Sequence, residues 1–323
     1  MGLAFVSAAG SVQASEGGNH NFSIGSQTVV PAIMPPPGFT EFYSYQLWYN
    51  IRSIRDNSGA SEIPEFRTDF LGHAGRIIHT WNTAVFGDNV HVGSGVIYLA
   101  DYAKVKVGPT RDEDADFSLV NIQPVLFSGK VRDVYWYTGI HLFYGVGHYD
   151  PTHVANTVTH YAHYPTAVSD NALTWIPTPR LDASINVSVS DNMMNHHTGY
   201  HSGSLVGVEW GVDYHPFVGL PKLSVGANGF YKQQFTDDTL HGIKLPDTEL
   251  VSEGAGPQFG WWFSPTAVVI LKWQRQFHVH NGPSGDLIWI EFAVPLNIPG
   301  LGGSPSPPGG APAVAPKHIQ LRA

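Results

Sequence analysis

The sequence predicts an all-β fold: one antiparallel up-and-down β-barrel of about 12 strands in the bacterial outer membrane. Charged residues make up only 13% of the chain, about half of the roughly 25% usual in soluble domains. The longest apolar run, residues 267–271, is far shorter than the roughly 20 residues of a transmembrane helix. Polar and apolar side chains instead alternate with a period of two, which places one chemical type on each face of a sheet.

Residues 1–14 are interpreted as a residual signal peptide. Residues 2–9 are small and apolar, and Val12-Gln13-Ala14 places small residues at the two positions that a signal peptidase reads. The positively charged start of a signal is missing, so a disordered apolar N-terminus is the alternative.

Residues 15–38 are predicted to form an extended segment that ends at Pro35-Pro36-Pro37-Gly38. Its apolar part, residues 28–34, precedes the first strand. Twelve strands enclose a narrow lumen that side chains nearly fill, so this segment is a candidate plug inside the barrel. The plug candidates are Val29, Val30, Ile33 and Met34. The alternative is a frayed periplasmic arm.

The barrel itself is predicted to span residues 39–296. Alternation is clearest in residues 181–190, where Leu181, Ala183, Ile185, Val187 and Val189 share one face. The other readable strands cover residues 39–52, 68–82, 90–107, 117–127, 134–147, 206–214, 222–235, 256–263, 267–280 and 288–294.

Bacterial barrels have an even number of strands, with long outer loops alternating with short periplasmic turns. The connection over residues 148–180 breaks that order. A weak additional strand over residues 163–176 restores it and brings the count to twelve. This strand is inferred from parity, and residues 108–116 are expected to form one of the outer loops.

The strands are about 10 to 15 residues long, whereas soluble strands average about 5 or 6 and a barrel span needs about 9 to 11. Aromatic residues gather near the strand ends, as in the girdles of membrane barrels. The polar face carries charge, and because lipid cannot solvate charge, that face must be the lumen. The lumen-lining candidates are Asp182, Glu209, Asp213, Lys222, Lys232, Lys272 and Glu291.

Catalysis is not expected. No Gly-x-Ser-x-Gly motif is present. Glu209 and Asp213 lie four residues apart on one strand, about 13 Å, which is too far to share a proton. Pairing with Lys222, Lys232 or Lys272 on nearby strands is the expected role of these carboxylates. No cofactor is predicted.

Histidine is abundant, with 17 residues, but no metal site is predicted. His196, His197 and His201 are weak candidates in an outer loop without a carboxylate to complete the set. His278 and His280 share one face of a strand near another outer loop, and a wet lumen or rim position is favoured there over metal binding.

The net charge of −9 and the lack of a basic stripe exclude a nucleic-acid partner. Residues 297–323 are rich in Gly, Pro and Ala and are predicted to be a disordered tail. The expected partners are outer-membrane lipids, a small hydrophobic or aromatic molecule and the barrel-assembly machinery. Leu296 stands where barrels usually carry a terminal aromatic residue.

Three segments resemble one known family. They are Glu16-Gly17-Gly18 with Pro36-Pro37-Gly38 and the tyrosine-rich first strand; residues 253–260 (EGAGPQFG) followed by Pro265; and Gly285-Asp286 leading into the last strand. Together they resemble the family called "putative MetA-pathway of phenol degradation", over residues 16–296. Residues 151–180 fit the family poorly.

The resemblance implies an outer-membrane barrel with a genetic link to the degradation of aromatic compounds. The expected function is therefore a channel for passive uptake of a small hydrophobic or aromatic compound. Two alternatives remain open, an outer-membrane lipid hydrolase and a secreted soluble β-sandwich that binds carbohydrate.

Overall fold

The computed structural model describes residues 21–296, apart from residues 23, 88, 149, 151–152, 160–163, 218–221 and 265. The predicted signal peptide and the predicted disordered tail lie outside the described residues. Among the described residues, no helix has the length and apolar character needed to span a membrane.

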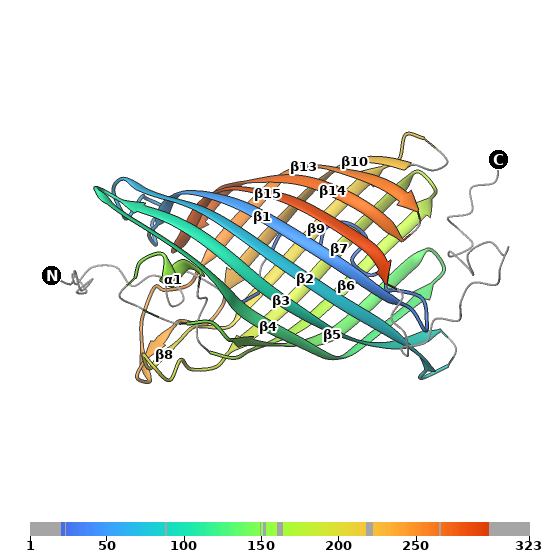
Figure 1. Ribbon diagram of the computed structural model, residues 1–323, viewed down its shortest axis with the longest axis horizontal. Coiled ribbons are helices and arrows are strands. Elements are labelled where there is room, and N and C mark those ends of the chain that lie inside the picture. Colours follow the sequence, from blue (N-terminus) through green and yellow to red (C-terminus); the bar gives the residue numbers. More distant parts are fainter. Residues whose placement is uncertain are drawn as a thin grey trace.

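The described chain folds into a closed antiparallel barrel, which confirms the predicted fold class. Each barrel strand pairs with its neighbour in the sequence, and the first pairs with the last to close the ring (Figure 1). The barrel strands are β1 (Thr40–Arg55), β2 (Phe66–Ala84), β3 (Val90–Val107), β4 (Thr110–Val131), β5 (Val134–Gly145), β6 (Thr166–Thr178), β7 (Leu181–Asn192), β9 (Leu205–Tyr214), β10 (Lys222–Gln234), β13 (Val251–Ser264), β14 (Ala267–His280) and β15 (Gly282–Leu296). Closure leaves no strand edge unpaired, as a span through hydrocarbon requires.

The strand inferred from parity is present as β6. It pairs with β5 and β7 along most of its length. Its outward positions include Leu173 and Trp175, both half exposed, whereas Asp170 and Thr174 are buried. The alternation was therefore readable there, but the polar residues on its inner face weakened the apolar signal.

Burial is inverted relative to a soluble protein. On β7 the polar residues Asp182, Asn186 and Ser190 are buried, whereas Ile185 and Val189 are exposed. The same holds for Ile290 of β15, which is 49% exposed beside the buried Glu291. Apolar side chains thus cover the outside of the barrel, and its inside holds the buried polar and charged residues together with apolar clusters. Val187, Val208, Val225 and Ile290 would be buried between two sheets in a sandwich, and here none of them is buried.

The long connections lie at one end of the barrel. They include helix α1 (Asn156–Thr159) and a small sheet of β8 (Tyr200–His201), β11 (Thr239–Leu240) and β12 (Ile243–Lys244). Figure 1 shows α1 and β8 at the same end. We call this end the loop end and the other the turn end, where Pro179 and Arg180, for example, suffice to connect β6 to β7.

The predicted outer loop over residues 108–116 is wrong. β3 ends at Val107 as predicted, but β4 begins at Thr110, before the predicted start at residue 117, so the two strands meet at a turn of two residues, Gly108 and Pro109. Backbone pairing continues in water after the lipid-facing pattern has ended, so the pattern underestimates the strand length. Two carboxylates of this extension, Asp112 and Asp114, accept hydrogen bonds from Ala155 and Asn156 beside α1.

The segment before β1 lies inside the barrel. At the loop end, the side-chain amide of Asn21 donates to Tyr164 O at 2.9 Å and to Thr166 Oγ1 at 2.8 Å. Further along, the amide of Ala32 lies 3.4 Å from Thr174 Oγ1. Thr166 and Thr174 are eight residues apart on β6, about 27 Å of strand. The segment therefore runs lengthwise through the lumen before β1 begins at the turn end.

Candidate functional site

Glu209 on β9 holds the backbone of the lumen segment. Its Oε1 accepts hydrogen bonds from the amide of Gly25 at 2.6 Å and from the amide of Gln27 at 2.8 Å. The side chain of Gln27 continues across the lumen and donates to Asp170 Oδ2 at 3.0 Å. Glu209 is fully buried. Hydrogen bonds from amides to a buried carboxylate are stronger than neutral ones, so this contact fixes the position of the segment.

Lys272 on β14 binds the same turn of the segment, but it donates to carbonyl oxygens where Glu209 accepts from amides. Its Nζ lies 3.0 Å from Gly25 O and 2.6 Å from Ser26 O, and it pairs with Glu291 Oε1 at 2.5 Å. The ammonium also lies 5.6 Å from the ring centre of Trp289. An ammonium group has three protons to donate, and these contacts satisfy a fully buried charge.

Two glutamines complete the polar contacts. Gln274 Nε2 donates to Gly25 O at 2.9 Å, and its Oε1 accepts from the indole N–H of Trp289 at 2.9 Å. Gln258 Oε1 accepts from Thr28 Oγ1 at 2.9 Å, while its Nε2 donates to Asp213 Oδ2 at 2.5 Å. Wall residues thus bind the segment through its backbone and its small polar side chains.

Two glycines of β9 leave space for the segment. A Cβ atom at Gly211 would lie 2.1 Å from the carbonyl oxygen of Thr28, and one at Gly207 would lie 2.1 Å from Cδ1 of Ile24. A side chain at Gly211 would displace the backbone of the segment, whereas one at Gly207 would require the end of the Ile24 side chain to move. Gly25 itself has φ of +113°, a conformation that only glycine adopts without strain.

An apolar cavity lies between the segment and the barrel wall, toward the loop end. Its volume is about 180 Å³. Phe22 and Ile24 of the segment line it together with wall residues Tyr45, Leu47, Tyr49, Phe70, Leu99, Leu119, Phe143, Phe230, Leu250, Leu287 and Trp289. An apolar cavity of about 150 Å³ in another protein holds benzene, so this one is large enough for a single aromatic ring.

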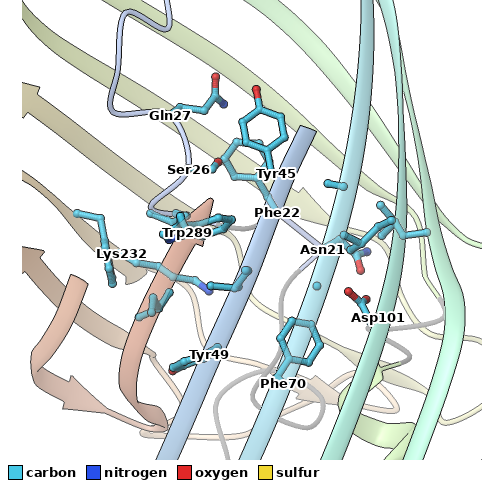
Figure 2. Close-up of a pocket in the computed structure, with 18 of the residues that line it drawn as sticks. Asn21, Phe22, Ser26, Gln27, Tyr45, Tyr49, Phe70, Asp101, Lys232 and Trp289 are labelled. Carbon is cyan, nitrogen blue, oxygen red and sulfur yellow. The ribbon is translucent and has the colours of Figure 1, made fainter. Parts of the chain in front are cut away.

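The cavity also contains a few polar groups. Figure 2 shows Lys232 and Trp289 on one side and Asp101 on the other. Asp101 Oδ2 accepts a hydrogen bond from Ser118 at 2.6 Å. Among the residues that the structure describes, Lys232 has no hydrogen-bond or ion-pair partner, although it is only partly exposed. Pockets of this composition, apolar with a few placed polar groups, are typical of small-molecule sites.

The seven lumen-lining candidates occupy different surroundings. Glu209, Lys272, Glu291 and Asp213 belong to the network around the segment, and Lys232 lines the cavity. Asp182 lies apart at the turn end, where its Oδ2 is 2.6 Å from Nε2 of His215. Lys222 is half buried near that end. The expected pairing of Glu209 and Asp213 with lysines is not formed: both carboxylates bind amide groups, and Lys272 pairs with Glu291 instead.

The four plug candidates are half buried, and Val29, Ile33 and Met34 make apolar contacts nearer the turn end. Val29 packs against Val268 and Ile270, and Ile33 and Met34 pack against a cluster around Ile78 and Leu126. Sequence reasoning missed the residues with most contacts, Gly25 to Thr28, because small polar residues produce no apolar pattern. Glycines at two inward positions of β9 were the available signal.

The three weak metal candidates lie in and beside the small sheet at the loop end. His196 and His197 are exposed, and His201 Nε2 lies 2.7 Å from the carbonyl oxygen of Asn192. Within the described residues, no group of three or more His, Asp and Glu is arranged to hold a metal ion.

A closed barrel with apolar residues outside and buried polar residues inside defines the class of outer-membrane β-barrel proteins. The model of the family "Putative MetA-pathway of phenol degradation" matches residues 51–292, and the chain belongs to this family. A comparison with curated proteins finds no significant match.

A solved structure of high similarity supports the fold. The COG4313 outer membrane channel from Pseudomonas putida F1 is similar at a TM-score of 0.68 and 11% identity, over 81% of this chain and 97% of that one. A Pseudomonas aeruginosa FadL homologue gives a TM-score of 0.38 and 10% identity over 88% and 97% of the two chains. The β domain of the Bordetella autotransporter BrkA gives a TM-score of 0.46 and 8% identity, over 79% of this chain and 98% of that one.

Proposed function

We propose that this barrel is a passive channel for a small hydrophobic or aromatic compound and that residues 21–37 act as its plug. The cavity carries this proposal, because it presents an aromatic and aliphatic surface of single-ring size beside the polar network of Glu209 and Lys272. Transfer of an apolar ring from water to this surface is favourable by about 25 cal/mol of free energy per Å² of apolar area buried. A polar solute has no such favourable term.

The plug side of the proposal rests on the position of the segment along the lumen axis. It contacts β6, β9, β13 and β14 through the hydrogen bonds described above, so it obstructs the polar path past Glu209 and Lys272. Deleting residues 22–34 is expected to raise single-channel conductance in planar bilayers. Unchanged conductance would reject the plug.

Solute uptake into proteoliposomes tests the substrate class. Entry of phenol-like solutes should exceed entry of sugars of similar size. Leu47→Trp would fill the cavity and should reduce phenol uptake several-fold. Leu173→Trp makes the same change on the lipid-facing side, where Leu173 is 50% exposed, and should leave uptake as in the wild type.

The same proteoliposomes distinguish a channel from the enzymatic alternative. We propose that the barrel carries out no catalytic step, so lipid composition should stay constant during transport. Release of fatty acid that depends on the barrel would contradict this proposal and favour an outer-membrane hydrolase.

A further inference from the structure

Two histidines and a glutamate meet outside the lumen, at the loop end. His278 and His280 end β14, and His278 is the partner of Glu253 on β13. The pairing is irregular at this point, because Gly254 pairs with Gln276 and Glu253 with His278, which leaves Phe277 without a partner. An extra residue of this kind reverses the alternation beyond it.

The reversal decides which side chains face outward. Before it, Lys272 and Gln274 are buried in the lumen; after it, Val279 is buried. The side chain of His278 is 49% exposed and that of Glu253 32% exposed. The two histidines therefore lie together on the outer side of the rim, accessible to solutes in the surrounding water and unconnected with the cavity.

The hydrogen bonds of the two rings determine where their protons are. His278 Nδ1 lies 2.9 Å from Glu253 Oε1, and His280 Nδ1 lies 2.7 Å from the carbonyl oxygen of Asn57. A carboxylate and a carbonyl only accept hydrogen bonds. Both Nδ1 atoms must therefore carry their protons, and in neutral rings both Nε2 atoms present lone pairs.

Those two Nε2 atoms face each other at 3.0 Å, with the ring planes inclined by 80°. Two lone pairs at this distance repel unless a positive charge lies between them. Either an additional proton or a metal cation can supply it. The hydrogen bonds from Nδ1 to Glu253 and to Asn57 hold the two rings in this arrangement, so a cation shared by the Nε2 atoms would relieve the repulsion.

We propose that His278 and His280 bind one divalent transition-metal cation through their Nε2 atoms. Metal-bound histidines almost always donate the other ring N–H to a carboxylate or a backbone carbonyl, and both such partners are present. Bonds of about 2.0–2.1 Å from zinc to each nitrogen fit this pair with an N–Zn–N angle of about 95°, and opening the pair by about 0.3 Å makes the angle tetrahedral. Imidazole ligands select zinc, copper or nickel over calcium and magnesium.

The ring of His280 is oriented by the ordered loop of residues 56–60. The Asp56 carboxylate accepts hydrogen bonds from the Ser58 hydroxyl at 2.7 Å and from the amides of Ser58 and Ala60 at 2.8 and 2.9 Å. These bonds, the one from Ser58 Oγ above all, lower the pKa of Asp56. They also fix Asn57, whose carbonyl orients His280. Two protein ligands leave the remaining coordination positions to water, so we expect an exchangeable ion.

Isothermal titration of the detergent-purified full-length barrel, produced without a polyhistidine tag, tests the site with zinc and nickel chloride. We expect one ion per chain. His278→Ala and His280→Ala should each weaken binding at least tenfold, and Glu253→Gln by 10- to 100-fold. The matched control, His196→Ala with His197→Ala, removes two exposed loop histidines and should bind as the wild type does. Circular dichroism confirms that each variant is a folded barrel.

Copper supplies a second readout, because the electron paramagnetic resonance of bound Cu²⁺ reports the number of nitrogen ligands. Two imidazole nitrogens are expected in the wild type and one in His278→Ala. Equal affinity in all variants would overturn the proposal. It would also be overturned by loss of binding in the His196→Ala/His197→Ala control alone, or by no binding at neutral pH, which would mean that a proton alone joins the two rings.

Discussion

Nζ of Lys272 lies 2.5 Å from Oε1 of Glu291 on the neighbouring strand, in the interior of the barrel, with 0% and 6% of the two side chains exposed. The same ammonium binds the carbonyl oxygens of Gly25 and Ser26. A charge pair in the barrel wall therefore holds a segment that is not part of the wall. This relationship makes the plug testable separately from the barrel.

Replacing Lys272 should release the plug. Breaking a buried ion pair by removing one partner costs about 3–5 kcal/mol, and Lys272→Met also removes the donor to Gly25 and Ser26. We expect larger and more frequent channel openings in planar bilayers. Lys272→Met with Glu291→Met leaves no buried unpaired charge, so openings in this double variant would show that the lost plug contact is the cause.

Lys244→Met provides the control for that experiment. Lys244 also forms an ion pair, with Asp237, but 71% of its side chain is exposed and it lies in the loop sheet. Exposed pairs contribute about 0–1 kcal/mol, so conductance should stay as in the wild type. Wild-type conductance in Lys272→Met as well would argue against a plug held by this residue.

A side chain at Gly211 should displace the plug without touching any charge. A Cβ atom there would meet the backbone of Thr28 at 2.1 Å, and backbone cannot rotate away. Gly211→Val is expected to raise conductance as deletion of the segment does. Ala227→Val makes a comparable change on the outer face, since Ala227 is exposed, and should have no effect. If the Gly211→Val channel stays closed, the strand that carries the valine has moved and the segment has kept its place, which would contradict the prediction.

A disulfide between the plug and the wall should lock the channel shut. The Cβ position of Gly207 lies 3.3 Å from Cγ1 of Ile24, which brings the two Cβ atoms close to the roughly 3.5–4.5 Å of a disulfide. The chain has no cysteine, so Ile24→Cys with Gly207→Cys can form one intended bond. Transport should stop after oxidation and return after reduction. Transport that persists through the oxidised barrel would show a path that does not need plug movement.

Lys232 should determine which aromatic compounds bind. Its ammonium is the unpaired cation of the cavity among the described residues. Hydrogen bonds to charged groups contribute about 1.5–3 kcal/mol, equivalent to roughly 10- to 150-fold in affinity. Lys232→Met is therefore expected to weaken binding of hydroxylated or carboxylated rings by this factor and to leave toluene binding unchanged. Ligand titrations that follow tryptophan fluorescence measure both, and an equal loss for toluene would point to collapse of the cavity.

The sequence alone was sufficient for the number and order of the strands in the barrel wall. Alternation in residues such as 181–190 depends only on the neighbours along one strand, and every second side chain must face lipid whatever the rest of the chain does. Even the weak strand β6 could be placed, because a barrel in which every neighbouring pair is antiparallel closes only with an even number of strands.

The contents of the lumen were decided by tertiary structure. Glu209, Lys272 and Gly211 were readable as inward positions, but their common partner, residues 25–28, lies between 180 and 250 positions away in the chain and enters through backbone atoms that every residue has. Likewise, a single extra residue at Phe277 turned His278 and His280 outward. The alternation along one strand determines which face of the sheet each side chain occupies. Hydrogen bonds across the lumen depend instead on which distant strands and segments lie opposite each other in the closed barrel. No local sequence pattern contains that information.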